Sequence, residues 1–176
     1  KTLTLNGCTF DKCTATKDGG EVYHASTSDT LTNVEFKECT SGKGGGGAYL
    51  ASTTINITGG KFEDCTAQST GGGVYLKSTA TISGCDFTND TVLDTSGLGG
   101  GIYFDGTKLE FSDGTISGCS ANNGGGIYQR AASNGVTILS GSITECHAAS
   151  GAGYYKHGGN LTINGGSITD CVATEN

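Results

Sequence analysis

Cysteine is the residue type whose spacing most clearly suggests chemistry in this chain. Six of the eight cysteines recur at multiples of about 26 residues, a period long enough for one turn of a repeat protein: Cys13, Cys39, Cys65, Cys119, Cys146 and Cys171. Thiols in such a series could form disulfides, bind a metal ion or pack as small apolar side chains. Because no Cys-x-x-Cys or Cys/His spacing typical of zinc occurs, we expect no metal site.

The state of these thiols depends on how the repeats are arranged. Cysteines in stacked turns would have Cα atoms about 4.8 Å apart, within reach of a disulfide, although identical rotamers would hold the sulfur atoms apart. Two readings stay open, a column of buried free thiols, which we prefer, and thiols paired between turns. In the fourth copy Asp90 takes the cysteine position, and we expect a local bulge there that turns the carboxylate outward. Cys8 and Cys85 belong to a different column, three turns apart.

Tyrosine follows the same period as the end of a Gly-Gly-Gly-apolar-Tyr motif. The residue before each tyrosine is mostly aliphatic, so strand alternation predicts an exposed tyrosine ladder with a glycine stripe beside it. Such a surface suits lateral packing or contact with a glycan, and the alternative is that the rings only stack on each other. The candidate binding residues are Tyr23, Tyr49, Tyr75, Tyr103, Tyr128 and Tyr155.

Acidic residues offer little sign of catalysis. Polysaccharide-cleaving solenoids need clustered carboxylates, often with calcium and a basic group. Here the outward acidic residues are scattered among Thr, Ser and Lys, and Arg130 is the single arginine. We therefore assign no catalytic residues, no metal site and no cofactor. The scattered acidic residues are Asp11, Glu35, Glu63, Asp86 and Glu110.

Two residue types that share one period indicate a solenoid of about seven copies. Alternating pairs such as Ile55 and Ile57 predict a strand with one buried face, and a second inward column contains Phe36 and Phe62. Glycines such as Gly60 lie two residues before this column and suit a bend between strands. The sequence therefore predicts an all-β, single-domain parallel β-helix over residues 1–176, with about seven rungs of roughly 26 residues and three short strands per rung.

The repeat also resembles a known family, the right-handed parallel β-helix repeats of polymorphic outer-membrane and surface adhesin proteins. Those repeats contain a Gly-Gly-aliphatic-aromatic strand and a Phe-x-x-Asn corner. The corresponding residues here are Gly71-Gly72-Gly73-Val74-Tyr75 and Phe62-Glu63-Asp64-Cys65, with cysteine in place of asparagine. The resemblance covers nearly the whole chain. It implies a right-handed solenoid at a cell surface and does not specify an activity.

Charge and surface composition limit the classes of binding partner. The net charge of −7 disfavours nucleic acid and anionic membranes, and no apolar run is long enough to span a bilayer. Threonines in two outward columns raise ice binding as a third possibility, although Asn56 and Glu110 interrupt the first column and His147 and Val172 the second, so we prefer ordinary solvent-facing strands. The columns are Thr4, Thr32, Thr81, Thr137 and Thr162, and Thr14, Thr40 and Thr66.

Three sequons would accept N-glycans in a secreted protein: Asn56, Asn89 and Asn160. The even number of cysteines also favours an oxidising compartment, so we expect an extracellular or cell-surface location.

The sequence as a whole favours a non-catalytic extracellular structural module, a building block of a stalk, adhesin or filament. Open solenoid ends would be covered by further rungs of a larger parent protein or by another copy of the chain, end to end or laterally. The second possibility is a carbohydrate-binding or polysaccharide-cleaving β-helix.

Overall fold

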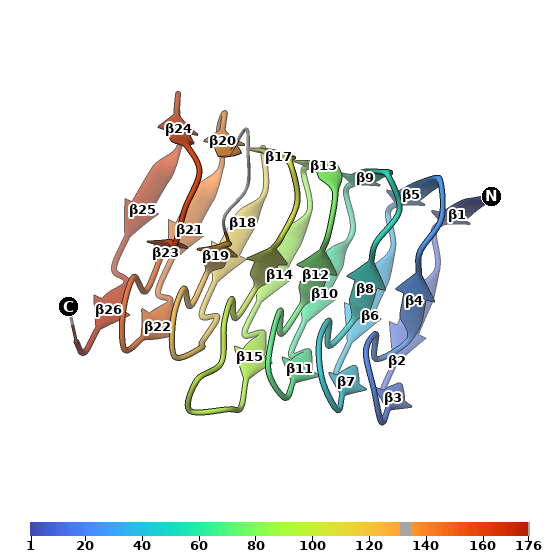
Figure 1. The fold of residues 1–176 in the computed structure, drawn as a ribbon, viewed down its shortest axis with the longest axis horizontal. Helices are drawn as coiled ribbons and strands as arrows, with labels where there is room; N and C mark the ends of the chain where they lie inside the picture. The colour runs from blue at the N-terminus through green and yellow to red at the C-terminus, as the bar shows by residue number, and fades with distance from the viewer. Residues whose placement is uncertain (131–134, 176) are drawn as a thin grey trace.

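The computed structural model describes residues 1–130 and 135–175 and contains short parallel strands without a helix. The chain coils so that each turn lies beside the next, from β1 at one end of the rod to β26 at the other (Figure 1). Six turns are complete, and a seventh contributes three strands. The predicted all-β solenoid of about seven rungs is confirmed.

Sheet A is formed by the first strand of every turn. All of its seven strands are parallel and in register. Inward positions are apolar and outward positions are polar along most strands, so β9 has alternating exposed and buried residues. The strands are β1 (Thr2–Asn6), β5 (Ser28–Thr32), β9 (Thr54–Thr58), β13 (Thr79–Ser83), β17 (Lys108–Ser112), β20 (Gly135–Ile138) and β24 (Leu161–Ile163).

Sheet B follows after a bend and has the phenylalanine column on its inner face. Phe36, Phe62 and Phe87 are fully buried and their rings stack at centroid distances of 4.6 and 4.8 Å. The predicted glycine at the bend is required at Gly60, because φ is +78° and an added Cβ would lie 2.1 Å from the Val34 carbonyl oxygen. The strands are β2 (Thr9–Asp11), β6 (Glu35–Lys37), β10 (Lys61–Glu63), β14 (Asp86–Thr88), β18 (Thr115–Ser117), β21 (Ser142–Thr144) and β25 (Ser167–Thr169).

Sheet C contains a fourth strand in most turns, which the predicted repeat of three strands lacks. These strands have only two residues and begin directly after the cysteine position, where the chain leaves a corner residue with positive φ such as Asp64. They are β3 (Thr14–Ala15), β7 (Thr40–Ser41), β11 (Thr66–Ala67) and β15 (Thr91–Val92), with the separate pair β22 (His147–Ala148) and β26 (Val172–Ala173). Single bridges through Ser120 connect the two groups.

Sheet D contains the Gly-Gly-Gly-apolar-Tyr motif and closes each turn. Its six strands pair tyrosine with tyrosine in every register. They are β4 (Val22–His24), β8 (Ala48–Leu50), β12 (Val74–Leu76), β16 (Ile102–Phe104), β19 (Ile127–Gln129) and β23 (Tyr154–Lys156).

Asp90 points inward, so the expectation that a local bulge turns its carboxylate outward is wrong. Its side chain is fully buried in the cysteine column, where Oδ1 accepts a hydrogen bond from the Cys65 N–H at 2.9 Å and Oδ2 has no partner among the described residues. The extra residues of this turn form a loop after β15, anchored by hydrogen bonds from Gln68 and Ser69 to Asp94. Because the extra residues form their loop after β15, the corner before Asp90 has the same geometry as in the other turns, with a positive φ at Asn89.

Register also corrects one of the threonine columns. Thr4 pairs with Thr30, whereas Thr32 pairs with Asn6 and Thr58 in the neighbouring column. The second column is as expected, since Thr14, Thr40 and Thr66 are paired in series.

Candidate functional site

The tyrosine ladder lies along the outer side of sheet D. Most consecutive rings stack nearly face to face, with centroids 4.2 Å apart for Tyr49 and Tyr75 and 5.4 Å apart for Tyr103 and Tyr128. The pair Tyr75 and Tyr103 is tilted by 30°. The ring faces of the inner members therefore contact other rings and cannot stack on a sugar. Only their edges and hydroxyl groups can reach a ligand, while Tyr23 at the end of the ladder is 59% exposed.

Exposure of the ladder is lower than the sequence suggested. Tyr103 and Tyr128 are 4% and 7% exposed, although strand alternation places both outside the apolar core. Each is sandwiched between two rings, and the Arg130 guanidinium, which contacts Asp105 beside the ladder at 2.8 Å, lies close to the Tyr103 hydroxyl. The predicted exposed ladder is thus wrong for these two rings.

The glycine stripe is also not a free surface. Gly71, Gly72 and Gly73 are buried, and each has its own structural reason. Gly71 has φ of +61°, a Cβ on Gly72 would lie 2.3 Å from the Gly100 carbonyl oxygen, and a Cβ on Gly73 would lie 2.7 Å from Asp90 Oδ2 and 3.0 Å from the Phe87 ring. The three glycines turn the chain, allow close approach of turns and leave space for the phenylalanine column.

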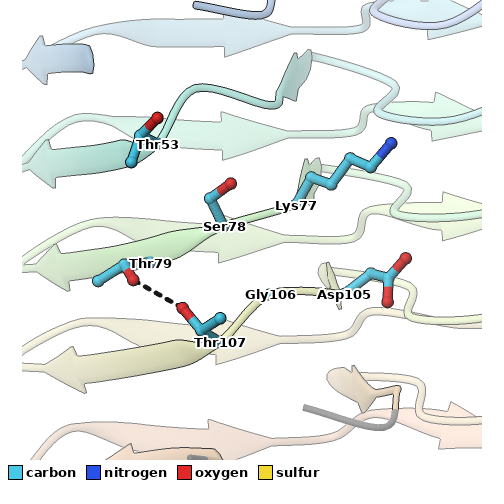
Figure 2. A pocket seen from close by; sticks show the side chains of 7 residues that line it. All are labelled: Thr53, Lys77, Ser78, Thr79, Asp105, Gly106 and Thr107. Atoms are coloured by element: carbon cyan, nitrogen blue, oxygen red, sulfur yellow. Dashed lines mark hydrogen bonds between the residues drawn. The ribbon is translucent and has the colours of Figure 1, made fainter. Parts of the chain in front are cut away.

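A polar hollow lies at the corner between sheets D and A, beside the middle of the ladder. It has a volume of about 410 Å³ and is lined by Thr53, Lys77, Ser78, Thr79, Asp105, Gly106 and Thr107. Figure 2 shows Lys77 and Asp105 extending from two neighbouring turns, and the Thr79 and Thr107 hydroxyls hydrogen-bonded at 2.8 Å. Gly106 has no room for a side chain, because a Cβ would lie 2.0 Å from the Ser78 carbonyl oxygen.

Asp105 connects the hollow to the ladder. Its Oδ2 accepts hydrogen bonds from the Tyr75 hydroxyl at 3.3 Å and from Arg130 Nη1 at 2.8 Å. Burial and the nearby Asp105 carboxylate raise the pKa of Tyr103 to about 12, so its hydroxyl stays protonated at neutral pH. The hollow offers hydroxyl groups, the Asp105 carboxylate and the Lys77 ammonium to a polar ligand, with no aromatic ring among its lining residues.

A serine, a histidine and an aspartate meet inside the first turns, which the sequence analysis did not anticipate. Asp29 occupies an inward position of β5 and is fully buried, as is Ser52. His24 Nδ1 contacts Asp29 Oδ1 and also Ser52 Oγ, the latter at 3.0 Å, while Ser52 Oγ donates to Asp29 Oδ1 at 2.9 Å. Both partners use the same imidazole nitrogen, whereas a catalytic triad places serine and aspartate on opposite nitrogens of the ring. This cluster therefore pairs a buried carboxylate and does not activate an accessible nucleophile.

The cysteine columns consist of free thiols in this structure. Cys39, Cys65, Cys119 and Cys146 are fully buried, while the end members Cys13 and Cys171 are half-buried. Each of these sulfur atoms contacts backbone carbonyl oxygens, as Cys39 Sγ does with Lys37 at 3.4 Å. Burial and the contact with Cys146 raise the pKa of Cys119, so this thiol stays neutral. The preferred reading of the columns, stacked buried thiols, agrees with this geometry.

The remaining candidate residues lie at the surface. Asn56, Asn89 and Asn160 are exposed, and Asn89 Nδ2 contacts Asp64 at 3.2 Å. No cluster of His, Cys, Asp or Glu within the described residues could hold a metal ion. No helix there is long and apolar enough to cross a bilayer.

Comparison with known proteins identifies the repeat. Residues 1–168 match the family model described as right handed beta helix region. Searches of curated proteins and of solved structures gave no match.

Proposed function

Because the chain belongs to the right-handed β-helix family, we propose that it is a non-catalytic structural module of an extracellular surface stalk, adhesin or filament. In this proposal, turns of neighbouring units stack end to end as the turns of one chain do. The observation that carries it is the complementarity of the two end turns, which present the same inward columns.

The two end turns expose apolar side chains in matching positions. At the first turn, Leu5 and Phe10 are only partly buried. One face of the Phe10 ring stacks on Phe36, and no ring of the described residues covers its other face. At the last turn, Ile163 and Ile168 are 49% and 42% exposed. Leu5 and Ile163 belong to one column of sheet A, and Phe10 and Ile168 to one column of sheet B. A following turn, from the same parent protein or from a second copy, would bury these side chains and pair the open strand edges.

Several outward carboxylates are engaged by lysines on the same strands. Glu35 contacts Lys37 at 2.7 Å, Glu63 contacts Lys61 at 2.7 Å, and Glu110 contacts Lys108 at 2.8 Å. Carboxylates in exposed ion pairs of this kind serve a solvated strand surface, which supports a structural role.

A surface location is supported by the resemblance to surface adhesin repeats and by the exposed sequon asparagines. Glycans at these positions would extend away from the apolar interior.

Head-to-tail stacking can be tested with two variants that block opposite ends. Leu5→Lys and Ile168→Lys each place an inward-pointing charge on an end turn, which opposes strand pairing there. We expect the native chain to form rods in electron micrographs at increasing concentration, and each variant alone to stay monomeric. A mixture of the two variants should form dimers and stop, because one intact end of each kind remains.

Thr169→Lys is the matched control, since it adds the same charge on the outward side of β25. It should assemble as the native chain does. A native chain that remains monomeric at every concentration, with a folded circular dichroism spectrum, would overturn end-to-end stacking.

The polar hollow favours carbohydrate binding as a second candidate. Asp105 accepts and Lys77 donates hydrogen bonds of the kind that sugar hydroxyl groups use. Titration of oligosaccharides, followed by NMR, should shift resonances of Thr79 and Thr107, and Lys77→Ala should weaken the effect while Lys12→Ala leaves it unchanged. If no oligosaccharide perturbs the hollow, this candidate is excluded.

A further inference from the structure

The outer face of sheet A over the first four turns is a regular array of small polar side chains. The three outward positions of β1, β5, β9 and β13 hold eight threonines, two serines and two asparagines in twelve places. We call this array the threonine face. Its three columns are Thr2, Ser28, Thr54 and Thr79; Thr4, Thr30, Asn56 and Thr81; and Asn6, Thr32, Thr58 and Ser83.

Register makes this array larger than the sequence alone suggested. With Thr30 in the central column and Thr32 in the next one, no position of the array is empty or apolar. Asn56, which looked like an interruption, is a small uncharged side chain with its own donor and acceptor.

The threonine face is also free of charge, in a chain with 10 basic and 17 acidic residues. Charged residues begin only at the fifth turn, with Lys108 and Glu110 on β17. Over the same first four turns, the outer face of sheet B is charged, as with Glu35 and Lys61. The absence of charge is therefore a local property of one face.

Its side chains are available to solvent. Outward residues of β1 and β9 are exposed, as is Thr81 on β13, while the other outward residues of β13 and all three of β5 are half-buried. Among the described residues, Thr79 is the only member of the array with a side-chain hydrogen bond, to Thr107. The other hydroxyl groups are left to bind water.

The side chains of the array are regularly spaced in two directions. Parallel strands repeat about every 4.8 Å, and outward residues on one strand repeat about every 6.6 Å. Threonine has a stiff χ1 angle, which fixes its hydroxyl and methyl groups relative to the strand. The repeat between strands is close to one of the spacings of water molecules on the prism planes of hexagonal ice, so an ordered water layer can match the hydroxyl groups along each column.

We propose that the threonine face binds ice. Hydroxyl groups would anchor ordered water in register with the lattice, while the methyl groups exclude water that is out of register. Charged residues would disturb such a layer because they orient water around themselves, which sets the boundary of the site at β17. A glycan on Asn56 would cover the centre of the face, so ice binding belongs to the unglycosylated chain.

The test measures ice recrystallisation inhibition and thermal hysteresis of the whole chain, produced in a host without N-glycosylation. We expect the native chain to stop crystal coarsening. The double variant Thr30→Lys, Thr81→Lys should need at least a tenfold higher concentration, because two charges then project from the central column.

The matched control is Thr88→Lys, Thr144→Lys, which adds the same charges to outward positions of sheet B. It should retain native activity, and thermal melts by circular dichroism should show all three proteins folded. The proposal is overturned if the folded native chain does not inhibit coarsening, or if the control loses as much activity as the test variant. It is also overturned if the face binds a crystalline polysaccharide and not ice. None of these results bears on end-to-end stacking, which involves the turn edges.

Discussion

Asp90 is the residue with the least favourable surroundings in the core. Burial raises its pKa well above the ordinary value, against the hydrogen bond from the Cys65 N–H. The neutral carboxyl is therefore the stable form in the folded chain. The stabilisation from this raised pKa is complete below the unfolded pKa of about 3.9 and is lost as pH rises through the folded pKa.

Asp90→Asn should remove this pH dependence. The amide oxygen can still accept from Cys65, and no charge has to be buried. We expect the variant to be more stable than the native chain by about 1–3 kcal/mol at neutral pH, with the difference shrinking toward pH 4. Urea unfolding across this pH range measures it.

Asp64→Asn is the control for this experiment, since Asp64 is exposed at the equivalent corner one turn away and its positive φ suits asparagine. If the free energy of unfolding of the native chain does not fall relative to that of Asp90→Asn as the pH rises, the Asp90 carboxyl is not buried.

Thiol reactivity provides a second prediction at this scale. The reactivity of a thiol depends on its access to the reagent, and five of the cysteines are buried: Cys39, Cys65, Cys85, Cys119 and Cys146. We expect iodoacetamide to modify only the half-buried Cys8, Cys13 and Cys171 in the folded protein, and all cysteines after unfolding. Intact mass spectrometry counts the adducts, and a cysteine that resists alkylation in denaturant without reductant would reveal a disulfide.

At the scale of elements, the Gly-Gly-Gly motif explains how four sheets close into a narrow coil. Its glycines are buried between neighbouring turns, so the motif does not form the open glycine stripe that the sequence predicts. Gly72→Ala should cost about 3 kcal/mol or prevent folding, because its Cβ would meet backbone atoms of Gly100 and Thr91 at 2.3 and 2.5 Å. Chemical denaturation measures the loss.

Gly7→Ala separates this clash from backbone strain. Its φ is +60° and an added Cβ would meet nothing within 4 Å, so only the left-handed conformation costs about 1 kcal/mol. Equal losses for the two variants would contradict close approach of the turns at Gly72.

The elements also show how far the sequence could predict this molecule. The repeat period and the alternation of apolar and polar residues were sufficient to assign most residues to columns, because identical residues such as Phe36 and Phe62 mark equivalent positions in each turn. They were insufficient where the length of a corner determines which residues pair. Thr32, for example, lies two residues beyond Thr30, which occupies the column assigned to Thr32. The inward Asp90 was missed because an insertion in the same turn suggested a bulge at the corner, whereas the loop forms after β15.

The candidate site was less predictable for a related reason. Lys77 and Asp105 line one hollow from neighbouring turns, and Arg130 reaches Asp105 from the next turn, because the corners between sheets D and A are stacked. The contact of His24 with Asp29 and Ser52 likewise joins neighbouring turns. No repeated residue type marks either cluster, so periodicity gave no signal for them.

At the scale of the whole molecule, the β-helix is a stack of equivalent turns, and its surfaces differ by face. Over the first four turns, sheet A presents an uncharged polar array and sheet B an ion-paired surface, while sheet D presents a ladder of stacked tyrosines. The end turns repeat the interior columns, which is the basis of the proposed end-to-end stacking.

In-register stacking of the turns is the claim on which these conclusions depend. Pulsed electron paramagnetic resonance tests it with pairs of spin labels on the central outward column of sheet A, attached through an unnatural amino acid so that native thiols do not react. Labels at Thr4 and Thr81, Thr4 and Thr137, and Thr4 and Thr162 span three, five and six steps of the stack. The distances should increase linearly, to about 14, 24 and 29 Å at 4.8 Å per step. Distances that do not increase with the number of turns would contradict the stack.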